Sequence, residues 1–131
     1  MVKHFIPSSL QEALEILNSE QVEIIAGGTD LMVQRRKWAN TVPQFAQTMN
    51  IIHVPELSYI KAKNNKLHIG STASLTDVLK HSDTPELLKK TIEVIASPAL
   101  RNIGTIAGNI GNASPAGDTL PILYVLNAKV V

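Results

Sequence analysis

Two glycine-rich segments carry the clearest chemical signal in this sequence. Six of the seven glycines lie either at Gly27-Gly28 or between Gly104 and Gly117. Glycine adopts positive φ easily and lets a ligand approach the main chain closely, so both segments are candidate binding loops. Gly27-Gly28 lies between a predicted strand and a predicted helix, where backbone N–H groups could bind a phosphate. An ordinary tight strand-to-helix turn explains this pair equally well.

The second segment, residues 104–118, combines small residues with amide and hydroxyl side chains and contains a single charged residue, Asp118. This composition is typical neither of a core nor of a flexible linker, and it suits a backbone cradle for a polar ligand that bears phosphate. Asp118 could accept hydrogen bonds from ribose or ribityl hydroxyls, or it could be the N-cap of the following helix, or both. Neither segment matches GxGxxG or GxxxxGK[ST], so neither a Rossmann site nor a triphosphate loop is predicted.

The other polar residues give weaker signals. Arg101 lies just ahead of the second segment and could neutralise a phosphate or simply be solvated. The four histidines show no paired spacing and cysteine is absent, so we expect no metal site, no thiolate nucleophile and no Cys-bound cluster on this chain. Because no catalytic pair or triad emerges, any redox chemistry must come from a bound cofactor.

The elements around the first loop follow from periodicity and capping signals. Ser9 and Glu12 match a capping box, in which Ser9 accepts from the Glu12 N–H and the Glu12 side chain reaches back to the Ser9 N–H. The helix that they open is predicted over 9–18. The further elements predicted here are a strand over 22–26, a helix over 31–38 with Thr29 or Asp30 as N-cap, and a weaker strand over 49–53.

The second loop is flanked by a predicted hairpin and several helices. Strands over 58–63 and 66–71 join at Asn64-Asn65, and since asparagine tolerates positive φ we expect a tight hairpin there. Helices are predicted over 74–81, over 85–96 with Leu87, Leu88, Ile92 and Ile95 buried, and over 121–127 after Asp118 and Thr119. Lys129-Val130-Val131 resembles the first residues of a strand, so we expect the architecture to continue beyond it.

Composition excludes several classes of protein. The 131 residues suffice for one domain, and 44% of them are apolar, which argues against wholesale disorder. Twelve basic and 11 acidic residues nearly cancel and are scattered, so the sequence predicts neither a nucleic-acid nor a membrane footprint. There is no signal-peptide core and no apolar run of membrane-spanning length. We therefore expect a cytoplasmic domain of mixed α and β structure.

The two glycine segments together resemble the FAD-binding (medium) subunit of the molybdenum hydroxylases, the family of xanthine, carbon monoxide and nicotinate dehydrogenases. The matching stretches are IIAGGTDL at 24–31, RNIGTIAGN at 101–109, and NASP at 112–115 leading to Asp118 and Pro121. Each stretch alone is a weak signal, whereas the pair in this order is specific. The match runs over nearly the whole chain.

The resemblance implies an α+β fold of the p-cresol methylhydroxylase type, in which two small subdomains hold FAD between them. Here they would span about 1–53 and about 54–131, as the N-terminal portion of a domain truncated at its C-terminal side. The positions expected to wrap the pyrophosphate are Glu23, Ile24, Ile25, Ala26, Gly27, Gly28, Thr29, Asp30 and Leu31. The remaining cofactor-binding positions are Gly104, Thr105, Ile106, Ala107, Gly108 and Asn109 in the second loop, with Ile95, Ser114 and Asp118.

The family's activity implies that the flavin receives electrons from [2Fe–2S] clusters on a small partner subunit and passes them to NAD or another acceptor. Hydroxylation would occur at a molybdopterin centre on a large subunit. Ala107 stands where many relatives have the first glycine of Gly-Gly-Asn. The alternatives are a truncated, non-catalytic assembly module that holds no flavin alone and a flavin reductase that forms UDP-N-acetylmuramate.

Overall fold

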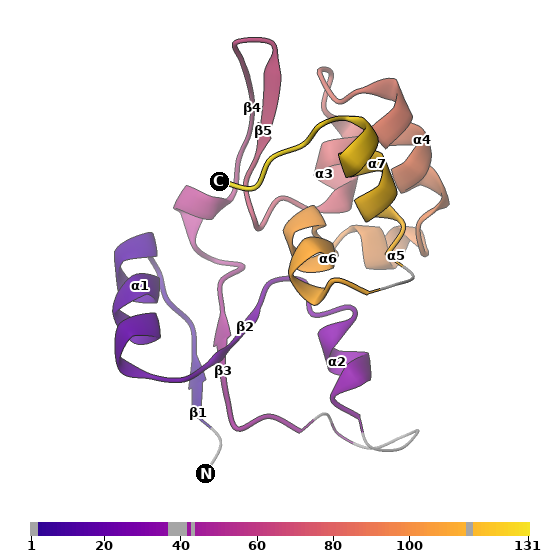
Figure 1. Cartoon of the computed structure of the whole chain (residues 1–131). Helices are drawn as coiled ribbons and strands as arrows, with labels where there is room; N and C mark the ends of the chain where they lie inside the picture. Colours follow the sequence, from indigo (N-terminus) through magenta and orange to yellow (C-terminus); the bar gives the residue numbers. More distant parts are fainter. Residues whose placement is uncertain (1–2, 37–41, 43, 115–116) are drawn as a thin grey trace.

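A computed structural model describes residues 3–36, 42, 44–114 and 117–131. The first part of the chain forms a three-stranded sheet with two helices. Its elements are β1 (Lys3–Phe5), α1 (Leu10–Ser19), β2 (Glu23–Ile25), α2 (Leu31–Gln34) and β3 (Gln47–Asn50). Both β1 and β2 pair with β3 in parallel, giving the order β1-β3-β2 (Figure 1). Parallel pairing follows because each helical crossover returns the chain in the same direction.

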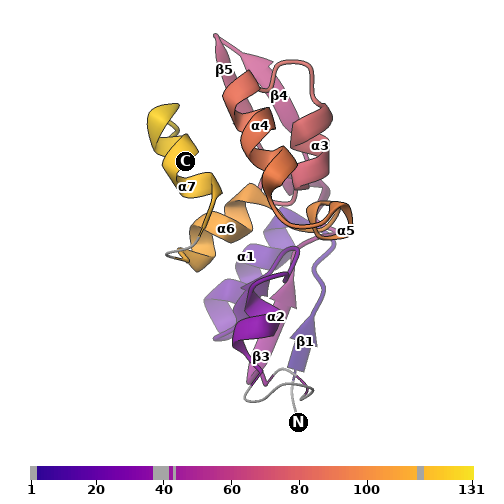
Figure 2. The same cartoon turned by 90° about the vertical axis from the view of Figure 1, so that its right-hand side faces the viewer.

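The second part is a hairpin covered by short helices. Its elements are the 3-10 turn η1 (Pro55–Leu57), β4 (Ile60–Lys63), β5 (Lys66–Ile69), α3 (Leu75–Lys80), α4 (Glu86–Val94), α5 (Pro98–Arg101), α6 (Ile106–Asn112) and α7 (Thr119–Val125). The predicted hairpin is confirmed, with positive φ at both Asn64 and Asn65. Figure 2 shows α3 and α4 beside the hairpin, with α6 and α7 next to each other.

Two apolar clusters stabilise these two parts. The first consists of Ala13, Met49, Ile51 and Val54, and the second of Ala73, Leu75, Val78, Leu88, Ile92, Ile95 and Ile106. The first cluster reaches slightly past residue 53. The subdomain boundary near that residue stays a prediction.

The cap of α1 differs in one bond from the predicted capping box. Ser9 Oγ accepts from the Glu12 N–H at 3.2 Å, as expected. The Glu12 carboxylate, however, accepts from the backbone N–H of Ser8 at 2.7 Å and from its hydroxyl at 2.8 Å, and not from Ser9. Ser8 replaces Ser9 as the partner of the Glu12 carboxylate because Ser8 offers two donors to one carboxylate oxygen. These bonds lower the pKa of Glu12, the backbone bond most strongly.

Three other expectations about the elements are wrong. The helix α2 ends at Gln34, with Arg35 as its C-cap; positions 37 and 38 of the predicted helix lie outside the described residues. Leu87 is exposed because the buried side chains of α4 follow the i, i+4 spacing of Leu88 and Ile92. Residues 129–131 form no strand, since no described strand pairs with them. No helix among the described residues is long and apolar enough to cross a membrane.

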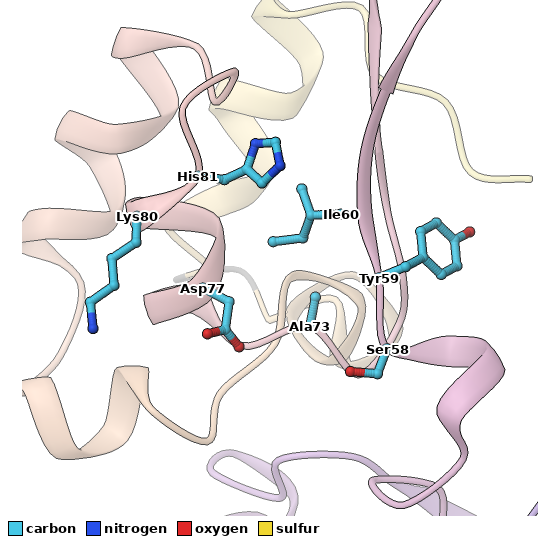
Figure 3. A pocket seen from close by; sticks show the side chains of 7 residues that line it. All are labelled: Ser58, Tyr59, Ile60, Ala73, Asp77, Lys80 and His81. Atoms are coloured by element: carbon cyan, nitrogen blue, oxygen red, sulfur yellow. The ribbon is translucent and has the colours of Figure 1, made fainter.

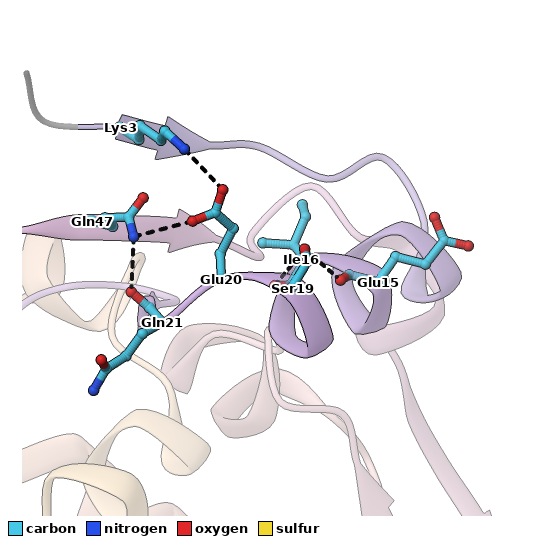
Figure 4. Close-up of polar contacts among 7 residues, drawn as sticks. All are labelled: Lys3, Glu15, Ile16, Ser19, Glu20, Gln21 and Gln47. Atoms are coloured by element: carbon cyan, nitrogen blue, oxygen red, sulfur yellow. Dashed lines mark hydrogen bonds and ion pairs between the residues drawn. The ribbon is translucent and has the colours of Figure 1, made fainter.

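A hydrogen-bonded carboxylate joins the end of α1 to the sheet. Glu20 accepts from Lys3 Nζ at 2.9 Å and from Gln47 Nε2 at 3.2 Å (Figure 4). The Lys3 bond first, and the Gln47 bond second, lower the pKa of Glu20 from its ordinary 4.5. Between the lowered pKa of the folded chain and pH 4.5, the unfolded chain binds more protons than the folded chain. The stabilisation from Glu20 is therefore fully present above pH 4.5 and is lost as the pH falls through the lowered pKa.

Glu20→Gln should therefore flatten the acid side of the stability profile. The expected result is a weaker pH dependence of the thermal midpoint below pH 4.5 than in the unmodified chain. Lys3→Met removes the first cause of the shift and should flatten the same region partly. An unchanged slope in Glu20→Gln would show that these bonds do not persist in solution.

Candidate functional site

A cavity of about 660 Å³ opens at the carboxyl end of β2, between the β2–α2 loop and α6. Figures 1 and 2 show this loop beside α6. The volume falls within the range of small-molecule sites, about 300–1,000 Å³, and the carboxyl ends of parallel strands are where such sites form. The lining residues are Val22, Ile24, Ile25, Ala26, Gly27, Gly28, Thr29, Asp30, Leu31, Ile51, Ser71, Thr105, Ala107, Gly108, Asn109, Gly111 and Asn112.

The two glycine segments touch each other, backbone against backbone. A Cβ built on Gly27 would lie 1.9 Å from the carbonyl oxygen of Ile103 and 3.0 Å from the Cα of Gly104. Only glycine allows this approach. The backbone of the other segment thus occupies the space that a Cβ of residue 27 would need, and the close approach of a ligand to this loop stays a prediction.

Backbone donors are concentrated in the β2–α2 loop. Gly28 has φ +69°, a left-handed conformation that turns the chain, and its carbonyl accepts from the Met32 N–H at 3.0 Å. Within the described part of the chain, the four N–H groups from Gly27 to Asp30 donate no hydrogen bond. A run of donors without protein partners on a cavity wall is suited to an anion.

The opposite wall is the helix α6, although the sequence indicated only a backbone cradle over 104–118 and no helix within 106–112. Thr105 is the N-cap of α6: its side chain is buried and Oγ1 accepts from the Gly108 N–H at 2.9 Å. Two glycines inside the helix lower its propensity by about 1 kcal/mol each. This cap and the burial of Ile106 in the second apolar cluster oppose that loss.

Most of the predicted cofactor-binding positions line the cavity together. They are Ile24, Ile25, Ala26, Gly27, Gly28, Thr29, Asp30, Leu31, Thr105, Ala107, Gly108 and Asn109. Their contact with a cofactor stays a prediction. The residues that sequence reasoning missed are Val22, Ile51, Ser71, Gly111 and Asn112. Gly111 and Asn112 lie three and four positions after Gly108, a helical spacing that is visible only once α6 is recognised.

Six predicted positions lie outside the cavity lining. Ile95 and Ile106 belong to the second apolar cluster, and Glu23 forms an ion pair with Arg35 at 2.7 Å. Asp118 is exposed at the start of α7, where its side chain makes no capping hydrogen bond. The remaining two, Gly104 and Ser114, flank α6.

Arg101 has a structural role in place of the phosphate contact considered above. One guanidinium nitrogen, Nη1, donates to the carbonyl oxygens of Glu93, Ile95 and Ala96 at 2.9–3.1 Å. These carbonyls lie in the last turn of α4 and just after it, where helix ends leave acceptors unsatisfied. The side chain therefore caps α4.

A second, smaller cavity of about 390 Å³ lies between the hairpin and α3 (Figure 3). Its acid, Asp77, accepts from the Ser74 hydroxyl at 2.7 Å in the capping box of α3, and the Lys80 side chain extends away from Ile60. We assign no function to this cavity. Among the described residues, no group of three His, Asp or Glu side chains could hold a metal ion.

Sequence comparisons identify the family. The chain matches the FAD binding domain in molybdopterin dehydrogenase over residues 1–131. It is 34% identical over 134 residues to the nicotinate dehydrogenase FAD-subunit of Eubacterium barkeri, covering 97% of this chain and 44% of the relative. It is also 34% identical over 128 residues to the glyceraldehyde dehydrogenase medium chain of Sulfolobus acidocaldarius, covering 94% of this chain and 44% of that relative. The chain thus spans less than half the length of these curated relatives.

Structural comparison gives the same result. Carbon monoxide dehydrogenase from Hydrogenophaga pseudoflava matches with a TM-score of 0.77 and 26% identity, over 88% of this chain and 41% of that one. Quinoline 2-oxidoreductase from Pseudomonas putida 86 shares the fold, with a TM-score of 0.75 and 24% identity, over 87% of this chain and 40% of that one. The chain belongs to the family of FAD-binding domains of molybdopterin dehydrogenases. Both the p-cresol methylhydroxylase-type fold and the resemblance to the N-terminal part of the medium subunits are confirmed.

Proposed function

We propose that this chain binds FAD, with the pyrophosphate in the cavity between the β2–α2 loop and α6. The observation that carries the proposal is the run of four N–H groups, from Gly27 to Asp30, on the wall of that cavity, none of which has a partner among the described residues. Among the described residues no lysine or arginine lines the cavity, so backbone dipoles would supply the positive potential. The two walls would hold the diphosphate, with Thr29 and Ser71 as hydroxyl donors.

The wider function follows from the family. We propose an oxidoreductase subunit of a molybdopterin-dependent dehydrogenase, which receives electrons from an iron–sulfur subunit and passes them to NAD or another acceptor. Bound FAD would supply the electron-transfer chemistry. The residues of this chain would bind the dinucleotide and fix its position. A large molybdopterin subunit is the expected second partner, in line with relatives named as subunits and medium chains. The cytoplasmic location stays a prediction.

The two subdomains belong to the same proposal. Residues from about 1–53 and about 54–131 would each fold around one of the two apolar clusters. In this arrangement the cavity forms where the first subdomain's β2–α2 loop meets α6 of the second.

The proposal is tested by adding FAD to the purified chain and passing it through a desalting column. We expect the visible flavin absorption band to elute with the protein, whereas riboflavin, which lacks the diphosphate, should be removed. Folded chain without FAD would contradict the proposal and favour the non-catalytic assembly module. The family match favours either of these over the UDP-N-acetylmuramate-forming reductase.

A further inference from the structure

Three side chains join the two walls of the cavity. Asn112, at the end of α6, accepts from Gln34 Nε2 through its Oδ1 at 2.8 Å. Its Nδ2 donates to Asp30 Oδ2 at 3.2 Å. Gln34 and Asp30 are 78 and 82 residues away in sequence and lie at the two ends of α2. We refer to Asn112, Gln34 and Asp30 as the clasp.

Within the part of the chain that the structure describes, the helix α2 has little else to hold it against α6. It is four residues long, contains no buried residue, and its N-cap side chain makes no capping bond. A helix of one turn is not stable by itself. Arg35 pairs with Glu23 at 2.7 Å, but Glu23 lies on β2, so this ion pair ties α2 to its own wall of the cavity. The clasp, in contrast, supplies two side-chain hydrogen bonds across the cavity.

The clasp also fixes the position of the Asp30 carboxylate, the acidic group among the described residues that line the cavity. Asp30 lines the cavity, and a carboxylate close to a diphosphate would repel it. The amide of Asn112 holds one oxygen of this carboxylate on the α6 side. Asparagine suits the position because it presents an acceptor to Gln34 and a donor to Asp30 at once.

We propose that Asn112 is a positioning residue for diphosphate binding: it fixes α2 and the Asp30 carboxylate against α6, so that the loop N–H groups keep the arrangement that accepts the ligand. This inference rests on the proposed function and adds a residue that acts through others. Gln34 makes it testable, since Gln34 takes part in the clasp but does not line the cavity.

The test is titration of the full chain with FAD, followed by flavin fluorescence, for Asn112→Ala, Gln34→Ala and the double variant. Because Asn112→Ala removes both hydrogen bonds of the clasp and Gln34→Ala removes one, we expect about tenfold weaker binding in Asn112→Ala and about threefold weaker binding in Gln34→Ala. The double variant should equal Asn112→Ala, because the Gln34 bond is already lost there. ADP, which carries the same diphosphate, should lose affinity by the same factors.

The matched control is Gln11→Ala, which removes an exposed glutamine bond to Glu15 on α1 and should leave FAD affinity unchanged. Unchanged affinity in Gln34→Ala, or additive losses in the double variant, would overturn the positioning role and indicate direct contact between Asn112 and the ligand.

Hydrogen exchange of the ligand-free chain separates this inference from the proposed function. Asn112→Ala should speed exchange at the α2 amides of Met32 and Gln34 and leave α1 as it was. If the unmodified chain binds no FAD, the proposed function fails, and this experiment alone decides the clasp. Unaltered exchange at the α2 amides in Asn112→Ala would refute the positioning role of Asn112.

Discussion

Gly27→Ala should weaken FAD binding by about 100-fold, a loss of roughly 2.7 kcal/mol of binding free energy. The added Cβ would lie 1.9 Å from the Ile103 carbonyl oxygen, far inside the 3.0 Å that Cβ contacts respect. Since both partners are backbone, neither can rotate away, and the β2–α2 loop must separate from the segment that precedes α6. The N–H donors of the loop then leave the positions in which they face one ligand together.

The same substitution should also lower the free energy of unfolding by about 1–3 kcal/mol, as overpacking does. Gly111→Ala is the matched control for stability, because its Cβ would meet nothing within 4 Å and alanine favours a helix. We expect Gly111→Ala to be as stable as the original chain or more so in chemical denaturation. If Gly27→Ala retained its FAD affinity, the phosphates would have to bind elsewhere.

Ile92→Ala should have the largest effect on folding. Ile92 is fully buried in the second apolar cluster, where it packs with Leu88, Ile95 and Ile106. Truncating such a side chain removes burial and leaves a cavity, which costs about 2–5 kcal/mol. Because Ile106 of α6 belongs to the same cluster, the loss also loosens the wall of the binding cavity.

Val94→Ala, two residues further along α4, is the control, since Val94 is 81% exposed. Its effect on the unfolding free energy should stay within about 0.5 kcal/mol. Urea denaturation of the two variants measures the difference. Equal losses would contradict the assignment of these two side chains to opposite faces of α4.

Local signals predicted much of the fold. The Asn64-Asn65 turn and the Ser9 cap were found because each depends on residues within a few positions of one another. In contrast, α6 was missed because its glycines argue against a helix. The packing of Ile106 under the second apolar cluster opposes that preference, and no local pattern reports such a contact.

The sequence likewise predicted the segments that form the candidate site but not the contacts between them. Both glycine segments were identified, and the structure brings them together in one cavity. The reason for Gly27 was missed, because its contact with Ile103 joins residues 76 positions apart. The roles of Arg101 and Asn112 were not predicted for the same reason, because each side chain has partners that only the folded chain places within reach.

Backbone amide chemical shifts, followed as FAD is added to the isotope-labelled chain, test the central claim most directly. We predict large shifts for the amides of Gly27, Gly28 and Thr29 and for that of Gly108 at the start of α6. The hairpin amides of Asn64 and Asn65, at the far end of β4 and β5, should not move. Shifts confined to other parts of the chain, or none at saturating FAD with the fold intact, would contradict the account.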